Sequence, residues 1–130
     1  MIKFETSRFG TLEVDDSKVI HFPEGLLGFN EINRYALIDY KDTPLKWLQA
    51  IDDPHIAFIV ADPKLFTPDY DLVIDYETRQ ILSLETDEDL AILVTVRVEN
   101  ERVIANFNGP ILLNASIMRG LQIVVETTTT

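Results

Sequence analysis

Apolar residues recur at every second position along much of this chain, and this spacing constrains the fold more than any other feature. Between residues 92 and 98, isoleucine or valine occupies every even position. Residues 103–107 repeat the alternation with valine, alanine and phenylalanine. A period of two is typical of half-buried strands. The polar segment Glu99-Asn100-Glu101-Arg102 lies between the two runs and predicts an antiparallel hairpin.

Further short apolar runs predict more strands of the same kind. Turn-forming sequences separate them, such as Pro23-Glu24-Gly25, Asp62-Pro63 and Asn108-Gly109-Pro110, and the prolines are confined to these breaks. The additional strand candidates are residues 2–5, 11–14, 19–22, 35–40, 45–51, 57–61, 72–74, 111–113 and 121–126.

These runs amount to about ten short strands, too many for one flat sheet of this size. The sequence therefore predicts an all-β fold, a small antiparallel barrel or folded-over sandwich with minimal helix. One short helix is expected at residues 77–84, where Ile81, Leu82 and Leu84 would cover an edge of the sheet. Residues 127–130, four threonines, have the composition of a frayed end.

The length and the residue types narrow the class of protein. A chain of 130 residues without a visible linker is expected to form one domain over residues 1–130. Because the chain contains no cysteine, disulfides, thiolate metal sites and cysteine nucleophiles are excluded. The charged residues near the N-terminus and the short apolar runs do not resemble a signal peptide or a membrane span, so a cytoplasmic location without membrane contact is expected.

The chain is strongly acidic, with 22 acidic against 11 basic residues and a formal net charge of −11. Nucleic acid is therefore a poor direct partner, because its phosphates would be repelled before specific contacts form. A basic protein partner fits the charge better. The alternative is that the acidity serves only solubility.

Motifs for nucleotide or nucleophile chemistry are missing from the sequence. Five glycines form no phosphate-binding loop, and Gly25 and Gly28 are expected to supply positive φ in a turn. His55 follows Asp52-Asp53-Pro54, so either carboxylate could in principle orient it as a base, but the serines have no nucleophile-elbow context. A capped surface histidine at a turn is the preferred interpretation.

Carboxylates are numerous enough to require a separate assessment. They cluster at Asp15-Asp16, at Asp69 with Asp71, and at residues 87–89, but no glycine closes any cluster into a calcium loop. We therefore expect no catalytic residues, no metal and no cofactor. Two alternatives stay open: a small-ligand-binding barrel, and a hydrolase that uses two carboxylates facing each other across a cleft.

The aromatic residues divide into two groups by their surroundings. Trp47 and Phe58 lie in strand-like segments and are expected to pack in the core. Tyr70 and Tyr76 lie among acidic residues. They are candidates for a partly exposed patch that contacts another protein.

Five segments together resemble the FliW family of flagellar assembly factors, in order and spacing across almost the whole chain. Phe107 and Gly109 depart from the family pattern, in which a leucine and a small residue such as alanine are expected. The five segments are residues 9–14 (FGTLEV), 20–29 (IHFPEGLLGF), 47–54 (WLQAIDDP), 57–63 (AFIVADP) and 106–114 (NFNGPILLN).

The resemblance implies a compact β-rich barrel that acts without catalysis. It implies a cytoplasmic factor that binds flagellin and, when flagellin is absent, binds the translational repressor CsrA and releases the flagellin message. The family antagonises CsrA at a surface away from its RNA-contacting face. From the −11 charge we add the hypothesis that the acidic body lowers the positive potential that attracts RNA to CsrA.

Partner-binding candidates combine the matched segment 106–114 with the exposed acidic turns. Asn108-Gly109-Pro110 is expected to interrupt a strand ladder and to leave the amides of Asn106 and Asn114 near an open edge; alternatively, these amides satisfy local backbone groups. The candidates are Asp69, Tyr70, Tyr76, Asp87, Asp89, Asn106, Pro110 and Asn114.

Overall fold

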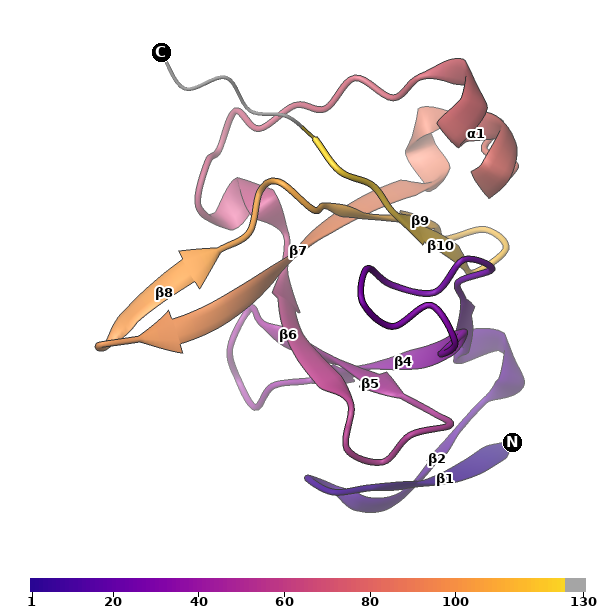
Figure 1. Ribbon diagram of the computed structural model, residues 1–130, viewed down its shortest axis with the longest axis vertical. Coiled ribbons are helices and arrows are strands. Elements are labelled where there is room, and N and C mark those ends of the chain that lie inside the picture. Colours follow the sequence, from indigo (N-terminus) through magenta and orange to yellow (C-terminus); the bar gives the residue numbers. More distant parts are fainter. Residues whose placement is uncertain (126–130) are drawn as a thin grey trace.

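The computed structural model describes residues 1–125, which form ten strands, one α-helix and three short 3-10 helices (Figure 1). The helix α1 spans Tyr76–Leu82, and the 3-10 helices span Asp16–Lys18, Pro63–Leu65 and Asp87–Asp89. The strands are β1 (Ile2–Thr6), β2 (Gly10–Val14), β3 (Ile20–His21), β4 (Arg34–Asp39), β5 (Lys46–Ala50), β6 (Ala57–Ala61), β7 (Leu90–Glu99), β8 (Arg102–Ala105), β9 (Ile111–Asn114) and β10 (Arg119–Gln122).

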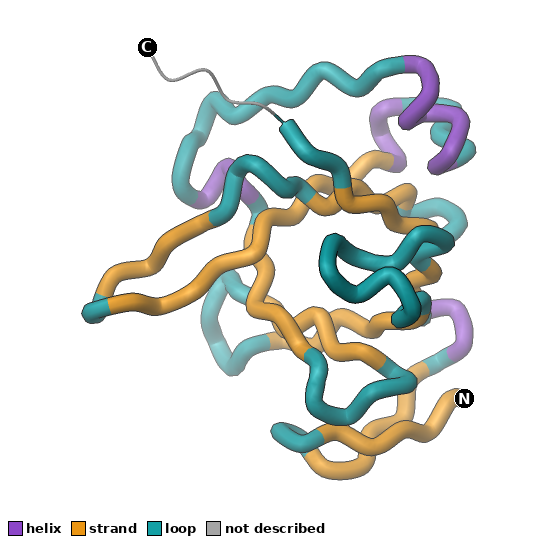
Figure 2. Tube along the Cα trace, in the orientation of Figure 1, coloured by secondary structure: helices purple, strands orange, loops and turns teal. Residues whose placement is uncertain are grey.

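Seven strands close into a ring. The sheet runs in the order β6-β5-β4-β3-β10-β9-β7, and β7 also pairs with β6, so the first and last strands meet. All but one of these pairings are antiparallel; the exception is β3 with β10, which is parallel at His21 and Arg119. The ring is visible as the closed loop of strands in Figure 2. The expected all-β, barrel-like fold is confirmed, with one parallel seam that the sequence did not predict.

The long strand β7 belongs to both the ring and a projecting hairpin. Its first half pairs with β9, its middle pairs with β6, and its last residues pair with β8. Asn100 and Glu101 in the turn have φ angles of 50° and 64°. Two positive φ angles are typical of a type I′ turn, whose twist matches that of the two strands it connects. Figure 1 shows β8 and the end of β7 reaching away from the barrel. The hairpin predicted from the alternation is confirmed.

Side chains that alternate into the ring fill its interior. Tyr35, Leu48 and Val60 are fully buried, and Phe22 packs edge to face against Tyr35 with ring centroids 5.3 Å apart. Gly120 on β10 makes room for Phe22, because a Cβ there would lie 2.3 Å from the ring. This tight fit shows that the barrel is a packed core.

The separate hairpin of β1 and β2 packs against the outer face of the barrel wall at β4, on the side opposite to Tyr35 and Leu37. Phe4 packs with Val19, Ala36 and Ile51 in a second apolar cluster. The turn of this hairpin is held at the barrel by the Ser7 N–H, which donates to the Pro54 carbonyl at 2.9 Å.

One expected strand is absent. Residues 72–74 are assigned to no strand, although their alternation is present in space: Leu72 and Ile74 pack against a third cluster around Leu82 and Leu112, while Val73 is 91% exposed. The pattern predicted the burial correctly, but no strand edge lies beside this segment to pair with it. The prediction of a strand here is wrong for that reason.

Two other predictions differ from the structure in their extent. The helix predicted at residues 77–84 forms as α1, capped by Asp75, whose carboxylate accepts from the Thr78 N–H, and ended by Ser83 at φ 51°. The strand predicted at residues 121–126 ends at Gln122, and residue 126 and the threonines after it lie outside the described residues. Gly25 and Gly28 have positive φ, as expected.

Candidate functional site

The predicted partner-binding residues divide between two places in the fold. Asp69 and Tyr70 in the loop after the 3-10 helix Pro63–Leu65 come near Asn106, because Tyr70 and Asn106 line the same surface cavity. The second group lies around α1 and the 3-10 helix Asp87–Asp89, and comprises Tyr76, Asp87, Asp89 and Asn114. Pro110 is buried.

Three aromatic rings form the centre of the first group, which we call the Phe107 face: Phe66, Tyr70 and Phe107, with Asp69, Asp71 and Asn106 at its border. Phe66 meets Phe107 edge to face with centroids 6.4 Å apart, and Tyr70 lies 6.0 Å from Phe107. Phe66 is 37% exposed. A cavity of about 500 Å³ opens here, lined by Tyr70, Leu72, Ala105, Phe107 and Val125 among others.

Local hydrogen bonds hold the two loops that make this face. Asp62 caps the 3-10 helix by accepting from the Lys64 N–H at 2.9 Å, which fixes the direction of the loop that carries Phe66 and Tyr70. On the other side, the Asn106 Oδ1 accepts from the Asn108 N–H at 3.1 Å. The Asn108 carbonyl in turn accepts from the Val125 N–H at 2.8 Å. The face is thus set by tied loops rather than by a regular element.

The border of the face is acidic while its centre is apolar. Asp69 and Asp71 are exposed, and neither has an ion pair among residues 1–125. Burial raises the pKa of the Tyr70 hydroxyl above its usual value. A cavity that combines aromatic and aliphatic side chains with Thr67, Asp71, Asn106 and Asn108 has the mixed composition of a protein-recognition surface.

Asn114 and Asp87 of the second group make structural contacts. Asn114 is 2% exposed, and its amide donates to the Leu82 carbonyl at 2.9 Å and to the Ser83 carbonyl, which ties the C-terminal end of α1 to β9. Its Oδ1 accepts from the nearby Ser116 N–H at 3.1 Å, so the structure supports the alternative role in which Asn114 satisfies backbone groups. Asp87 forms an ion pair with Arg79 at 2.7 Å. Tyr76, the first residue of α1, is 76% exposed, and Figure 1 shows α1 across the molecule from β8.

The geometry around His55 gives no catalytic triad within residues 1–125. The imidazole Nδ1 lies 2.6 Å from the Ser7 hydroxyl. Asp53 instead accepts from the backbone N–H of His55, and Asp52 is held by Arg34 in a two-point pair at 2.6 and 3.0 Å. The histidine is thus capped at a turn, and neither carboxylate contacts its ring.

The three aspartates with a clearly shifted pKa all have it lowered, which is the opposite of what a general acid requires. Hydrogen bonds from Arg34 lower the pKa of Asp52, and hydrogen bonds from Ser17 and Thr78 lower those of Asp15 and Asp75. A general acid at neutral pH needs a raised pKa. Within the described residues no cluster of three metal-ligating side chains occurs, and no helix is long and apolar enough to cross a membrane.

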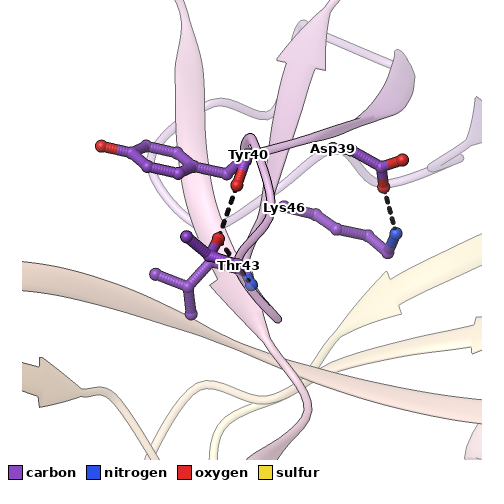
Figure 3. A network of polar contacts seen from close by, with 5 residues as sticks. Asp39, Tyr40, Thr43 and Lys46 are labelled. Carbon is purple, nitrogen blue, oxygen red and sulfur yellow. Dashed lines mark hydrogen bonds and ion pairs between the residues drawn. The ribbon is translucent and has the colours of Figure 1, made fainter.

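The two aromatic residues expected in the core differ in their surroundings. Phe58 packs against the main core cluster, as expected. The expectation is wrong for Trp47, which is half-buried and stacks on Tyr40 at 5.5 Å, with the Arg8 guanidinium 4.3 Å above its ring. Figure 3 shows the adjoining turn, in which the Thr43 hydroxyl donates to the Tyr40 carbonyl and Lys46 pairs with Asp39. Trp47 is at the second position of β5, and no signal in its own strand marked it as a surface residue.

Comparison with known proteins identifies a family for the whole chain. A family model described as FliW protein matches residues 3–130. The flagellar assembly factor FliW of Caldanaerobacter subterraneus subsp. tengcongensis is 40% identical over 96% of this chain and 86% of its own length. That of Geotalea uraniireducens is 41% identical over 96% of this chain and 78% of its own length.

Solved structures give the same result. A crystal structure of the flagellar assembly factor FliW superposes with a TM-score of 0.90 at 26% identity and covers 98% of this chain and 91% of that one. Each of these relatives is described as an assembly factor. The chain therefore belongs to the FliW family of flagellar assembly factors.

Proposed function

We propose that this protein is a cytoplasmic, non-enzymatic regulator that binds flagellin and, when flagellin is absent, binds and antagonises the translational repressor CsrA. Flagellin translation would then follow flagellin export. Membership of the FliW family supports the flagellar role. The observation that carries the binding role is the Phe107 face, where a cavity of about 500 Å³ is lined by aromatic and aliphatic side chains together with Asp71.

The part of this face that suits flagellin is its aromatic centre rather than its acidic border. Unassembled flagellin has amphipathic terminal segments, whose apolar side needs cover until export. Tyr70 and Phe107 line the cavity and Phe66 packs against Phe107 beside it; partly exposed rings of this kind anchor apolar side chains at interfaces. Burying one such side chain contributes about 1.5–3 kcal/mol.

The acidic charge fits the second partner. CsrA binds RNA and therefore presents positive potential, and a protein with a net charge of −11 docked nearby would lower it. We expect association with CsrA to weaken steeply as salt rises, because the attraction acts between exposed charges. A flat dependence on salt would reject this electrostatic mechanism.

Titration calorimetry with flagellin and CsrA from the same organism, separately and in competition, tests the proposal. We expect binding to both, with each partner weakening the affinity for the other. Phe107→Ala and Tyr70→Ala should weaken flagellin binding at least about tenfold, the scale of one lost interface anchor. The matched control is Tyr76→Ala, which removes an exposed ring away from the face.

The possible results separate the parts of the proposal. Binding to neither partner by folded wild-type protein would reject the function. Binding to both with equal losses for Phe107→Ala and Tyr76→Ala would keep the function and reject the Phe107 face. Circular dichroism and an unchanged urea midpoint must accompany each variant, so that loss of fold is not read as loss of contact.

A further inference from the structure

Strand β8 has one edge that nothing in the described residues pairs with. The sheet order ends at β8, whereas the other end of the order, β6, closes onto β7. β8 pairs only with β7, from Val96 with Ala105 to Glu99 with Arg102. Within residues 1–125, β8 is therefore the open edge of the eight-stranded sheet. An open edge is a template for another extended chain.

The type I′ turn determines which backbone groups face that edge. In a two-residue hairpin, Glu99 and Arg102 exchange both ladder hydrogen bonds, so the groups of Val103 point outward and those of Ile104 point to β7. The Asn106 N–H donates to the Thr95 carbonyl at 2.9 Å, which continues the same alternation. The N–H and C=O groups of Val103 and Ala105 thus face the open edge.

Proline, lysine and a bulge, three of the features that block pairing at an edge, are absent from β8, although the strand is only four residues long and begins with the exposed Arg102. β8 reads Arg-Val-Ile-Ala, without proline or lysine and without a bulge in its register with β7. Val98 and Val103 lie opposite each other on one face of the hairpin and are 65% and 49% exposed. The opposite face carries the Arg97–Glu99 ion pair at 2.8 Å. An incoming strand would extend an apolar face as well as a ladder.

The charges at the two ends of β8 indicate the kind of segment that would fit. The end of β8 opens into the cavity of the Phe107 face, because Ala105 and Asn106 line it; Asp71 lines it as well, and Asp69 precedes Tyr70 in the same loop. At the other end Glu101 lies next to Arg102, the first residue of β8, and neither has an ion pair among residues 1–125, so these two charges offset each other. Lysine or arginine at the cavity end of the incoming segment would meet the aspartates.

We propose that the open edge of β8 binds an extended segment of a partner protein by strand addition, and that this segment has alternating apolar residues with a basic residue at the end that lies over the cavity. A second copy of this chain would bring the same acidic groups to the edge, and the net charge of −11 opposes that pairing. Backbone bonds to Val103 and Ala105 supply the register, and the Val98 and Val103 side chains supply the apolar contact.

A synthetic peptide tests the edge without either partner: acetylated and amidated KTVTVTK, titrated into the ¹⁵N-labelled protein at millimolar concentration. We expect amide exchange to slow at Val103 and Ala105, and shifts to centre on β8. Two further peptides carry N-methyl groups on both valines or on all threonines. Since only alternate amides of an added strand face β8, one N-methylated peptide should bind and the other should fail.

Substitution in the protein gives the matching test. Val103→Pro removes an outward N–H without removing a ladder bond to β7, so the hairpin should persist. Peptide binding should weaken by about tenfold or more. Val103→Thr keeps the N–H and the branched shape, and is the control. If Val103→Pro disturbs the hairpin, the Ile104 amide will lose its protection against exchange. In that case the two N-methylated peptides, tested on the wild-type protein, decide whether the edge binds by strand addition.

Several results would overturn the proposal. These are no binding at millimolar peptide, equal binding of both N-methylated peptides, or shifts confined to acidic residues away from β8. Protection of Val103 and Ala105 that rises with protein concentration alone would assign the edge to a second copy. The inference rests on the proposed function only in taking a protein as ligand; because the assay contains no flagellin or CsrA, its failure leaves the calorimetric test unaffected.

Discussion

The barrel and the β7–β8 hairpin are made from the same alternating pattern but use it differently. In the barrel each strand of the ring has two neighbours, and residues such as Leu48 and Val60 are fully buried. In the hairpin, β8 has one neighbour, and Val98 and Val103 are exposed. We infer that stability resides in the barrel and that the hairpin, with the adjoining Phe107 face, is available for binding.

The largest expected effect is on the barrel side of this comparison. Leu48→Ala creates a cavity at a fully buried site and should lower the free energy of unfolding by about 2–5 kcal/mol. Val98→Ala in the hairpin is the matched control and should stay within about 0.5 kcal/mol. Urea denaturation measures both. Equal losses would show that the hairpin is part of the stabilising core.

The next effect concerns the fit of Phe22 against β10. Gly120→Ala places a Cβ 2.3 Å from the Phe22 ring, so the ring must move, at a cost of about 1–3 kcal/mol. Adding Phe22→Leu to the Gly120→Ala protein should recover part of that loss, because the smaller side chain vacates the contact. Additive losses in the double variant would contradict this account.

Tyr35 offers a smaller effect with the opposite sign. Its hydroxyl is buried without a hydrogen-bond partner among the described residues, so Tyr35→Phe should stabilise the protein by about 1 kcal/mol. Burial also raises the pKa of Tyr35 to about 12 from 10.0. Unfolded chains release this proton first, so wild-type stability should fall as pH rises from about 10 toward 12.

Urea midpoints of wild type and Tyr35→Phe check both parts when they are measured at pH 9, below both pKa values, and at pH 11, between them. The gap between the two proteins should widen at the higher pH, since only the wild type carries the Tyr35 hydroxyl. An unchanged gap would mean that Tyr35 ionises at the same pH in the folded and unfolded states.

The smallest effect is local to the hairpin turn. Glu101 has φ 64°, a conformation that glycine adopts without strain, so Glu101→Gly would give the Asn-Gly sequence preferred in type I′ turns. We expect the free energy of local opening of the turn to rise by about 0.5 kcal/mol, which would be seen as slower amide exchange near Glu99 and Arg102. The global urea midpoint should barely move. A matching global shift would mean that the hairpin and barrel unfold together.

Much of the barrel could be predicted from the sequence because its strands are long enough to show alternation. β7 and β8 are examples, and the turn between them was identified from its polar residues. The parallel seam could not be predicted, because β3 is only two residues long and carries no period. In the segment 72–74 the alternation is present and predicts which side chains are buried. It does not predict a strand, because strand pairing also requires a neighbouring strand, and this segment is paired with none among the described residues.

The binding role of the candidate residues stays a prediction, but the structure does show which of them lie together. Tyr70 and Asn106 line one cavity although they are 36 positions apart in the chain. Phe107 entered the sequence analysis only through the alternation of residues 103–107 and as a departure from the family pattern, and Phe66 has no distinguishing signal in the sequence. Their roles depend on two loops meeting in space, and local residue patterns carry no information about that meeting.

The parallel seam has a consequence for how the protein is made. The His21 N–H donates to the Met118 carbonyl at 2.9 Å, so closure joins residues near opposite ends of the described chain. Contacts between such distant residues form late and slow folding. On the ribosome, the ring cannot close until β10 has emerged, and until then β3 lacks its β10 neighbour. A stall before residue 119 would leave an open-edged nascent chain exposed to chaperones and proteases.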